Sequence, residues 1–439
     1  MHKKSALFLS VIVFLALTGC ADAIENTLER TDENEIVERE DEDEVRHLQI
    51  VENDIPAFDA SLYEAPLSQR ELEVSESLRR MDARISSSVL KANDGKNLVF
   101  SPYSLDHVLA MGINAVKDEV LEDVFGQYGL ESQDLDAMNA VIRKSLNKQA
   151  ALDKSVVLQT ANKLWVDYSI PVYSSYVSVL KNFYDAETQA IDCSSSESSK
   201  TVNQWVEKQT NGLIRNVAGE GCVNWRANLM NIVYMKAGWT SPFMDFKTSR
   251  QKFTNIDGSE SEVDMMHQTQ MFAYAQTESG KLLRMPLGYD GQYEVVFLLP
   301  DEMNSLTGNM LGELDATVDK CRDVKVDVLL PKLRIYNCLS LNDYVRSNGL
   351  SSLLARASYT RFSPGGEAPV GEILQHACLE FTEEGTAAAA VTMHMDTSDG
   401  EKHEQEVSDF HMNRPFLFVV RNSQDGTLLF VGRVCDAGN

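Results

Sequence analysis

The histidines and cysteines are the residues of this chain best suited to metal or nucleophilic chemistry, and their spacing matches no such site. No Gly-x-Ser-x-Gly, His-Glu-x-x-His or Gly-rich phosphate loop occurs in the sequence. His394 and His403 lie within one polar stretch, but without a third ligand nearby we expect them to be solvated. The sequence therefore predicts no metal site, no cofactor and no enzymatic activity of its own.

One segment could take part in chemistry as a substrate. It reads Glu383, Glu384, Gly385, Thr386, Ala387, Ala388, Ala389, Ala390, Val391 and Thr392. Four alanines favour a helix, yet no amphipathic stripe surrounds them and strand-like apolar runs flank the segment. In a strand, Thr386, Ala388 and Ala390 would face one way and their neighbours the other, and none of them is charged, bulky or proline. Gly385 provides backbone freedom, so we expect this segment to be able to enter a sheet.

The N-terminus predicts an exported protein. A basic start is followed by an apolar run from Ala6 to Leu17 that is too short to span a bilayer, and then by Leu-Thr-Gly-Cys20. This pattern resembles the bacterial lipoprotein signal, in which Cys20 becomes the lipidated first residue of the mature protein. The alternative is an ordinary secretory signal with a chance cysteine. We expect residues 1–19 to be a signal peptide and the protein to be lipid-anchored to the cell envelope.

The acidic composition restricts the partners of the protein. Residues 20–67 are crowded with Asp and Glu and predict a disordered tether, whereas residues 68–439 predict a single domain. A net charge of −26 makes nucleic acid an improbable partner and argues against a heparin-type cofactor. We expect Lys144, Lys148 and Lys154 to lie on a solvated helix face. The cysteines after Cys20 match no metal motif, and buried free thiols are expected, although export would permit disulfides.

Apolar periodicity and turn residues predict a mixed α+β fold with antiparallel sheets, because helices dominate early and strands late. Helices are predicted at 71–91, from Ser101-Pro102 onward, at 173–184 and at 200–211. Strands are predicted at 156–167, 229–237, 281–286, 293–299, 324–330, 373–382, 416–421 and 428–434.

Several short motifs, taken in order, resemble the serpin family over nearly the whole domain. They include Asn97 to Ser104, Ala161 to Trp165, Asn231 to Lys236, Leu330 to Leu333, Pro415 to Phe418 and Val431 to Val434. The resemblance implies the serpin fold, with three mostly antiparallel β-sheets, about nine helices and an exposed reactive-centre loop at about 383–411. It also implies that Glu383 to Ala390 form an inhibitory-type hinge.

The resemblance assigns mechanical roles to other residues. Ser101, Ser104, Asn231 and Gln375 fall where serpins place a polar network beneath the point at which the large sheet parts. Ser101 beside Pro102 could instead simply cap a helix. Trp239 falls where the loop first enters the sheet, and without the resemblance it would be read as a core aromatic.

The resemblance further implies a suicide-substrate inhibitor that traps a serine or cysteine protease as a covalent complex. The resemblance places the scissile bond at Asp399-Gly400 by family spacing. Counting back from Pro415 gives instead the window from Glu401 to Glu404, so Glu401 and Lys402 are alternatives. We expect a monomer whose partners are its target protease and, through Cys20, the membrane. The alternative is a non-inhibitory serpin-like binding or chaperone protein.

Overall fold

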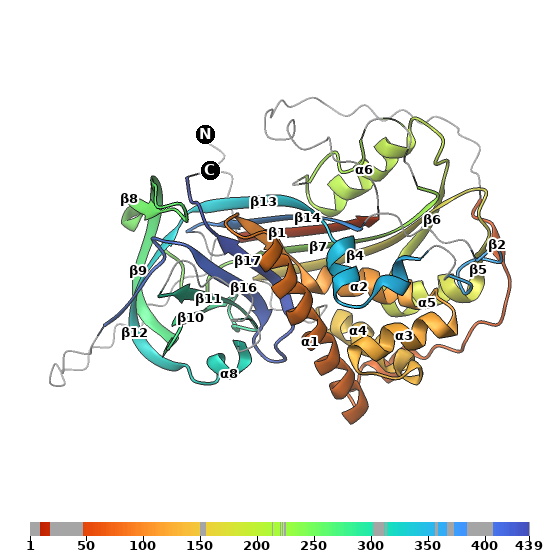
Figure 1. Ribbon diagram of the computed structural model, residues 1–439, viewed down its shortest axis with the longest axis horizontal. Coiled ribbons are helices and arrows are strands. Elements are labelled where there is room, and N and C mark those ends of the chain that lie inside the picture. The colour runs from red at the N-terminus through yellow and green to blue at the C-terminus, as the bar shows by residue number, and fades with distance from the viewer. Residues whose placement is uncertain are drawn as a thin grey trace.

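The computed structural model describes residues 9–17, 47–149, 155–301, 311, 314–355, 359–366, 373–383 and 407–438, apart from residues 213, 220, 222 and 224. One large sheet crosses the molecule, with α6 on one face and α1 to α5 on the other (Figure 1). A second large sheet lies at the end opposite to β2 and β5 (Figure 1). This is the expected α+β architecture with mostly antiparallel sheets.

Eight α-helices occur among the described residues. They are α1 (Gln69–Ala92), α2 (Pro102–Ile113), α3 (Asp118–Tyr128), α4 (Leu135–Gln149), α5 (Ser174–Tyr184), α6 (Ser198–Gln209), α8 (Leu314–Val318) and α9 (Asn342–Ser347). The first begins at a capping box, in which the Ser68 hydroxyl accepts from the Glu71 backbone N–H and the Glu71 carboxylate accepts from the Ser68 N–H. Of the apolar stripe predicted for this helix, Leu78, Met81, Ile85 and Leu90 are buried, whereas Leu72 is exposed.

The six-stranded sheet has the order β13-β14-β1-β7-β4-β6. Its strands are β13 (Leu333–Ser340), β14 (Ile373–Phe381), β1 (Leu9–Leu17), β7 (Ala227–Ala237), β4 (Val156–Asp167) and β6 (Glu187–Ile191). Neighbours are antiparallel except for the parallel pair β4 and β6. Both β7 and β14 are almost entirely buried, although each carries polar residues, including Asn231 and Gln375.

The nine-stranded sheet has the order β15-β12-β9-β10-β11-β16-β17-β3, with β8 paired to β9. Its strands are β15 (Ser408–His411), β12 (Arg322–Pro331), β9 (Glu260–Thr277), β10 (Gly280–Leu287), β11 (Tyr293–Pro300), β16 (Phe416–Asn422), β17 (Leu428–Val434), β3 (Leu98–Phe100) and β8 (Ser249–Thr254). All pairs are antiparallel except β12 with β15. The third sheet consists of β2 (Ile50–Val51) and β5 (Val172–Tyr173).

The expected tether is shorter than predicted at its C-terminal end. Strand β2 pairs with β5, and the Asn53 side chain accepts from the Ser175 backbone N–H at 2.8 Å. Phe58 and Tyr63 stack on each other and contact the Phe183 ring edge-on. A few apolar residues in an acidic sequence are therefore enough to hold residues 47–67 against the domain. Residues 20–46 lie outside the described part of the chain.

The prediction of a solvated lysine face is wrong for Lys144. Only 8% of this residue is exposed, and its Nζ donates to the Glu71 carboxylate at 2.8 Å and to the Pro66 carbonyl at 3.1 Å. The capping box of α1 brings Glu71 to the lysine, which single-helix patterning could not reveal. Lys148 is exposed and pairs with Asp425, and Lys154 lies outside the described residues.

Among the described cysteines, Cys193, Cys378 and Cys435 are buried free thiols, and Cys321 is free and partly exposed. The partly exposed Cys338 has its Sγ 3.4 Å from His376 Nε2. The described residues contain no cluster of three or more His, Cys, Asp or Glu placed to bind a metal ion. Of the helices that the structure describes, none combines the length and apolar character needed to cross a membrane.

Candidate functional site at the parted sheet

The central feature of the large sheet is that β7 and β14 do not pair with each other. Strand β1 lies between them, with seven residue pairs on each side. Val11 pairs with Leu379 and Leu17 with Ile373, so β1 runs antiparallel to β14, and it runs antiparallel to β7 as well. Since neighbouring strands lie about 4.8 Å apart, β7 and β14 are separated by about 10 Å. We call this position between the two strands the slot.

The four polar residues that the resemblance assigned to a network all lie beneath the slot, and each is 0% exposed. The Gln375 amide on β14 accepts from the Ser101 backbone N–H at 2.8 Å and donates to the Ser101 carbonyl at 2.9 Å. The Ser104 hydroxyl donates to the Asn231 side-chain oxygen on β7. Because the Ser101 hydroxyl also accepts from the Ser104 backbone N–H, the start of α2 joins both edges of the slot.

Ser101 caps a helix and also contacts Gln375 at the edge of the slot, whereas its role in parting the sheet stays a prediction. Its hydroxyl is the N-cap of α2, and its backbone is the hydrogen-bond partner of Gln375. The residue therefore caps a helix whose first turn lies at the centre of the parted sheet.

Two further asparagines belong to this region and were not singled out from the sequence. Asn231 donates to the Asn162 side-chain oxygen at 2.7 Å, and Asn162 donates to the Tyr184 carbonyl at 2.7 Å. On the other side, the Asn337 amide accepts from the Val99 N–H at 2.7 Å and donates to the Val99 carbonyl at 2.9 Å. The sequence offers no distinctive signal for Asn162, because its strand also carries Gln159, Thr160 and Lys163.

Trp239 lies directly after β7, at the end of the slot nearest to the hinge. Its indole N–H donates to the Thr382 carbonyl at 3.0 Å, and its ring stacks on Phe381 with centroids 6.3 Å apart. The rings of Phe243 and Phe297 complete the cluster. The tryptophan is thus both a core aromatic and a direct contact of the chain segment that leads into the hinge.

Of the expected hinge, Glu383 to Ala390, the structure describes Glu383 alone. Two partners contact its carboxylate. The Lys332 ammonium lies 2.8 Å from one oxygen, and the Thr248 hydroxyl donates to the other at 2.9 Å. Burial raises the pKa of Glu383, but the hydrogen bonds and the charge of Lys332 outweigh this and hold the pKa below its usual value. The hydrogen bond to Glu383 in turn raises the pKa of Lys332.

We expect Lys332→Met to destabilise the protein by about 1–2 kcal/mol, because it leaves a carboxylate with 7% exposure without its cation. A carboxyl group whose pKa is lowered by folding stabilises the folded protein at pH values above its ordinary pKa of about 4.3. This stabilisation is lost as the pH falls through the pKa of the folded state. Thermal unfolding should therefore separate the variant from the parent at pH 7 and less at pH 3. Lys252→Met is the control, since the Lys252–Glu260 ion pair is exposed. An equal loss in both variants would contradict this assignment.

Helix α2 is also joined to α1 by two carboxyl groups, Asp82 on α1 and Asp106 on α2. Asp82 is 5% exposed, and the two side chains are hydrogen bonded to each other. Burial raises the pKa of both groups, and for Asp106 the charge of Asp82 raises it further. Ionising both groups would place two repelling charges in a buried contact, so we expect the pair to retain a proton when the two helices are packed.

Asp106→Asn is expected to stabilise the protein at alkaline pH. A carboxyl group whose pKa is raised by folding ionises at a lower pH in the unfolded chain, where its pKa is about 3.9, than in the folded protein. The free energy of unfolding therefore falls as the pH rises from about 3.9 through the pKa of the folded state. The amide cannot ionise and can still donate a hydrogen bond to Asp82. Melting temperatures measured from pH 5 to pH 8 should fall less steeply for the variant than for the parent. The exposed Asp123→Asn should follow the parent, and parallel curves for all three proteins would refute a shared proton.

The C-terminal end of the loop is held by β15. Two imidazoles share one carboxylate there, with His267 Nε2 lying 2.8 Å from one oxygen of Asp327 and His411 Nε2 2.9 Å from the other. Burial raises the pKa of Asp327, but hydrogen bonds from Thr269 and both histidines lower it more, to about 2. Phe410 is fully buried against Tyr274. Strand β15 is therefore held by both an apolar contact and a hydrogen bond to Asp327.

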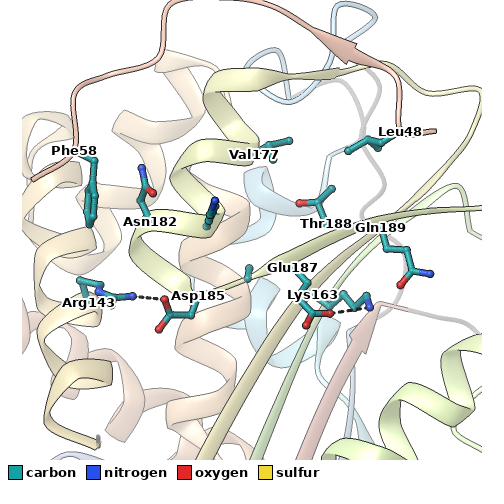
Figure 2. A pocket seen from close by; sticks show the side chains of 12 residues that line it. Leu48, Phe58, Arg143, Lys163, Val177, Asn182, Asp185, Glu187, Thr188 and Gln189 are labelled. Atoms are coloured by element: carbon teal, nitrogen blue, oxygen red, sulfur yellow. Dashed lines mark hydrogen bonds and ion pairs between the residues drawn. The ribbon is translucent and has the colours of Figure 1, made fainter. Parts of the chain in front are cut away.

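A separate cavity of about 740 Å³ lies where the segment containing Leu48 and Phe58 crosses β6 and α5 (Figure 2). Two ion pairs line it, Arg143 with Asp185 and Lys163 with Glu187 (Figure 2). The Lys163 ammonium also lies 4.3 Å from the Trp165 ring centroid. None of the site residues predicted from the sequence lines this cavity.

The remaining predicted site residues lie outside the described part of the chain. These are Cys20, Glu384, Gly385, Thr386, Ala387, Ala388, Ala389, Ala390, Asp399, Gly400, Glu401 and Lys402. The structure thus brings together the network, Trp239 and Glu383 around the slot, and the hinge beyond Glu383 and the scissile bond remain predictions.

Comparison with known proteins agrees with this geometry. A family model described as Serpin (serine protease inhibitor) matches residues 76–437. An uncharacterised serpin-like protein of Thermococcus kodakarensis is 28% identical over 349 residues, which covers 78% of this chain and 81% of that protein. Human leukocyte elastase inhibitor is 26% identical over 359 residues, covering 78% and 93%. The structure of an Arabidopsis serpin in its native stressed conformation superposes with a TM-score of 0.72 at 24% identity, covering 85% of this chain and 100% of that one.

Proposed function

We propose that this chain, which belongs to the serpin family, is a suicide-substrate inhibitor that traps a serine or cysteine protease as a covalent acyl-enzyme. One observation carries this proposal. The large sheet is parted between β7 and β14, and the strand in the slot runs antiparallel to both. A segment that leaves the end of β14 and folds back into the sheet must take this same direction. The buried contacts of Glu383 and Trp239 lie at the end of the slot where such a segment would start.

In the proposed reaction the protein supplies the bond that is cut and the protease supplies the nucleophile. The serine or cysteine of the protease attacks the carbonyl carbon of Asp399, an ester or thioester bond forms, and the amide bond to Gly400 breaks with release of a new amino terminus. The freed N-terminal part of the loop then enters the slot and carries the attached protease with it. Distortion of the protease active site prevents water from completing hydrolysis.

The hydrogen bonds that the inserted loop would form are not enough by themselves to drive its insertion into the slot. About a dozen new backbone hydrogen bonds contribute roughly 0.5–1.5 kcal/mol each, which approximately offsets ordering a dozen residues at about 1–2 kcal/mol each. Insertion must therefore release strain stored in the intact protein, for which serpin loop insertion is the general example. The polar network is suited to this change, because α2 bonds to both edges of the slot while they are apart.

We further infer that the protein acts outside the cytoplasm as a monomer, attached to the membrane through a lipid on Cys20. The lipoprotein-like sequence before Cys20 and the acidic stretch after it support this location. The acidic residues around Asp399 favour a target that prefers Asp or Glu, whereas Lys402 would suit a trypsin-like enzyme.

The proposal is tested by incubating the purified protein with a panel of serine and cysteine proteases of different specificity. We expect at least one protease to form a complex that survives boiling in SDS, with a mass equal to the protease plus the N-terminal part of the inhibitor. Mass spectrometry of the released C-terminal peptide identifies the scissile bond. If every protease clips the loop without forming such a complex, the protein is a non-inhibitory binding or chaperone protein instead.

A further inference from the structure

The occupant of the slot is the N-terminal apolar segment of the same chain. Strand β1 reads Leu-Ser-Val-Ile-Val-Phe-Leu-Ala-Leu and contains no charge, proline or glycine. Val, Ile and Phe favour strands, and nine residues in a strand extend about 30 Å. Strand β14 is also nine residues long, so the segment covers nearly the whole edge that β14 offers.

The segment and the reactive loop would use the same hydrogen-bonding groups. Leu9 to Leu15 pair with Ala237 to Asn231 on β7, and Val11 to Leu17 pair with Leu379 to Ile373 on β14. A strand edge can pair with one neighbour only, so β1 and an inserted loop exclude each other. Figure 1 shows β1 lying between β14 and β7 along the length of the sheet.

We propose that the unprocessed chain is an inactive precursor, in which the N-terminal segment fills the slot and prevents the loop from inserting. Processing before Cys20, three residues beyond the end of β1, removes the whole strand and makes the slot available. The inference rests on the proposed function, because it assigns an occupant to the slot that the cleaved loop would use. The 29 residues between Leu17 and His47 can extend about 95 Å, so the connection to the domain does not prevent this pairing.

The test compares three full-length proteins that retain residues 1–19. Cys20→Ala blocks lipoprotein processing and keeps β1, and Cys20→Ala with Val13→Pro disrupts it. Val13 pairs with Ala377 on one side and Val233 on the other, and proline in a central strand removes a ladder hydrogen bond. Ala23→Pro, added to Cys20→Ala, is the matched control outside the strand. Each protein is nicked with a lysine-specific endoprotease, because Lys402 lies in the loop and residues 18–46, which connect β1 to the domain, contain no lysine. The cut is located by mass spectrometry, and melting temperatures are measured before and after.

We expect nicking to change the melting temperature of the Cys20→Ala protein by less than about 2 °C and to raise that of the Val13→Pro protein by more than about 10 °C. The Ala23→Pro control should behave like the Cys20→Ala protein. Independently, hydrogen exchange of the intact Cys20→Ala protein should show protected amides in residues 9–17, a result that does not depend on how the proline variant folds.

The possible failures are distinguishable. Unprotected amides in residues 9–17, or an equal large rise on nicking in all three proteins, would overturn the precursor proposal and leave the inhibitor proposal intact. If nicking does not raise the melting temperature of the Val13→Pro protein, loop insertion itself is overturned. The assignment of β1 as an occupant that prevents insertion then fails as well.

Discussion

Thr386→Arg is expected to convert the protein from an inhibitor into an ordinary substrate of its target protease. Thr386 is the first side chain after Gly385 that would have to enter the sheet during insertion. Burying an unpaired guanidinium costs several kcal/mol, and each 1.4 kcal/mol on the barrier slows insertion about tenfold. Deacylation should therefore overtake insertion, and the trapped fraction should fall by about 100-fold or more.

The measurement is the ratio of SDS-stable complex to cleaved inhibitor after reaction with limiting protease. Thr386→Ser is the matched control, because it keeps a small hydroxyl side chain at the same position and should trap at the parental level. The rate of loop cleavage should be equal in all three proteins, since the substitution lies well away from Asp399. Undiminished trapping by the arginine variant would rule out insertion of this segment.

Asn231→Leu is expected to have the largest effect on stability of the substitutions considered, a loss of about 2–6 kcal/mol. The residue is fully buried, and its amide accepts from Ser104 and donates to Asn162. Its removal leaves two buried polar groups without this partner, at about 1–3 kcal/mol each. Chemical denaturation of the parent and variant measures the difference directly.

The control for Asn231→Leu is Asn139→Leu. Asn139 on α4 is also buried and bonds Asn114 and the Tyr184 hydroxyl, but it contacts no edge of the slot directly and is linked to Asn231 only through Tyr184 and Asn162. Both variants should lose stability, whereas only Asn231→Leu should also change the rise in melting temperature that follows loop cleavage. If the two variants change that rise equally, the network is merely structural and has no special role in parting the sheet.

The sequence predicted elements best where apolar patterning was strong. Strand β4 matches the predicted bounds, and β7, β11 and β14 match within two residues at each end. Strands β8, β9 and β13 were missed because they are half-exposed and carry many polar residues, so no apolar run marks them. Their pairing, not their composition, makes them strands.

In the candidate site, too, the sequence predicted some residues and missed the contacts between them. The family resemblance identified Ser101, Ser104, Asn231 and Gln375, but the sequence could not show that α2 bonds one strand through a backbone and the other through a hydroxyl. Lys332 and Thr248 were not recognised as partners of Glu383, because they lie 51 and 135 residues away in the chain. Contacts of this kind follow from the topology of both sheets.

By itself the sequence determined the fold class, the candidate hinge and the absence of a recognisable catalytic motif, because these depend on residue type and local spacing. Only the tertiary structure decided what lies between β7 and β14. A nine-residue apolar run has the same local pattern whether it is a signal segment or a buried strand. The segment is a strand here because it pairs with the edges of β7 and β14, which lie more than 200 residues away along the chain. The backbone groups at these edges need hydrogen-bond partners.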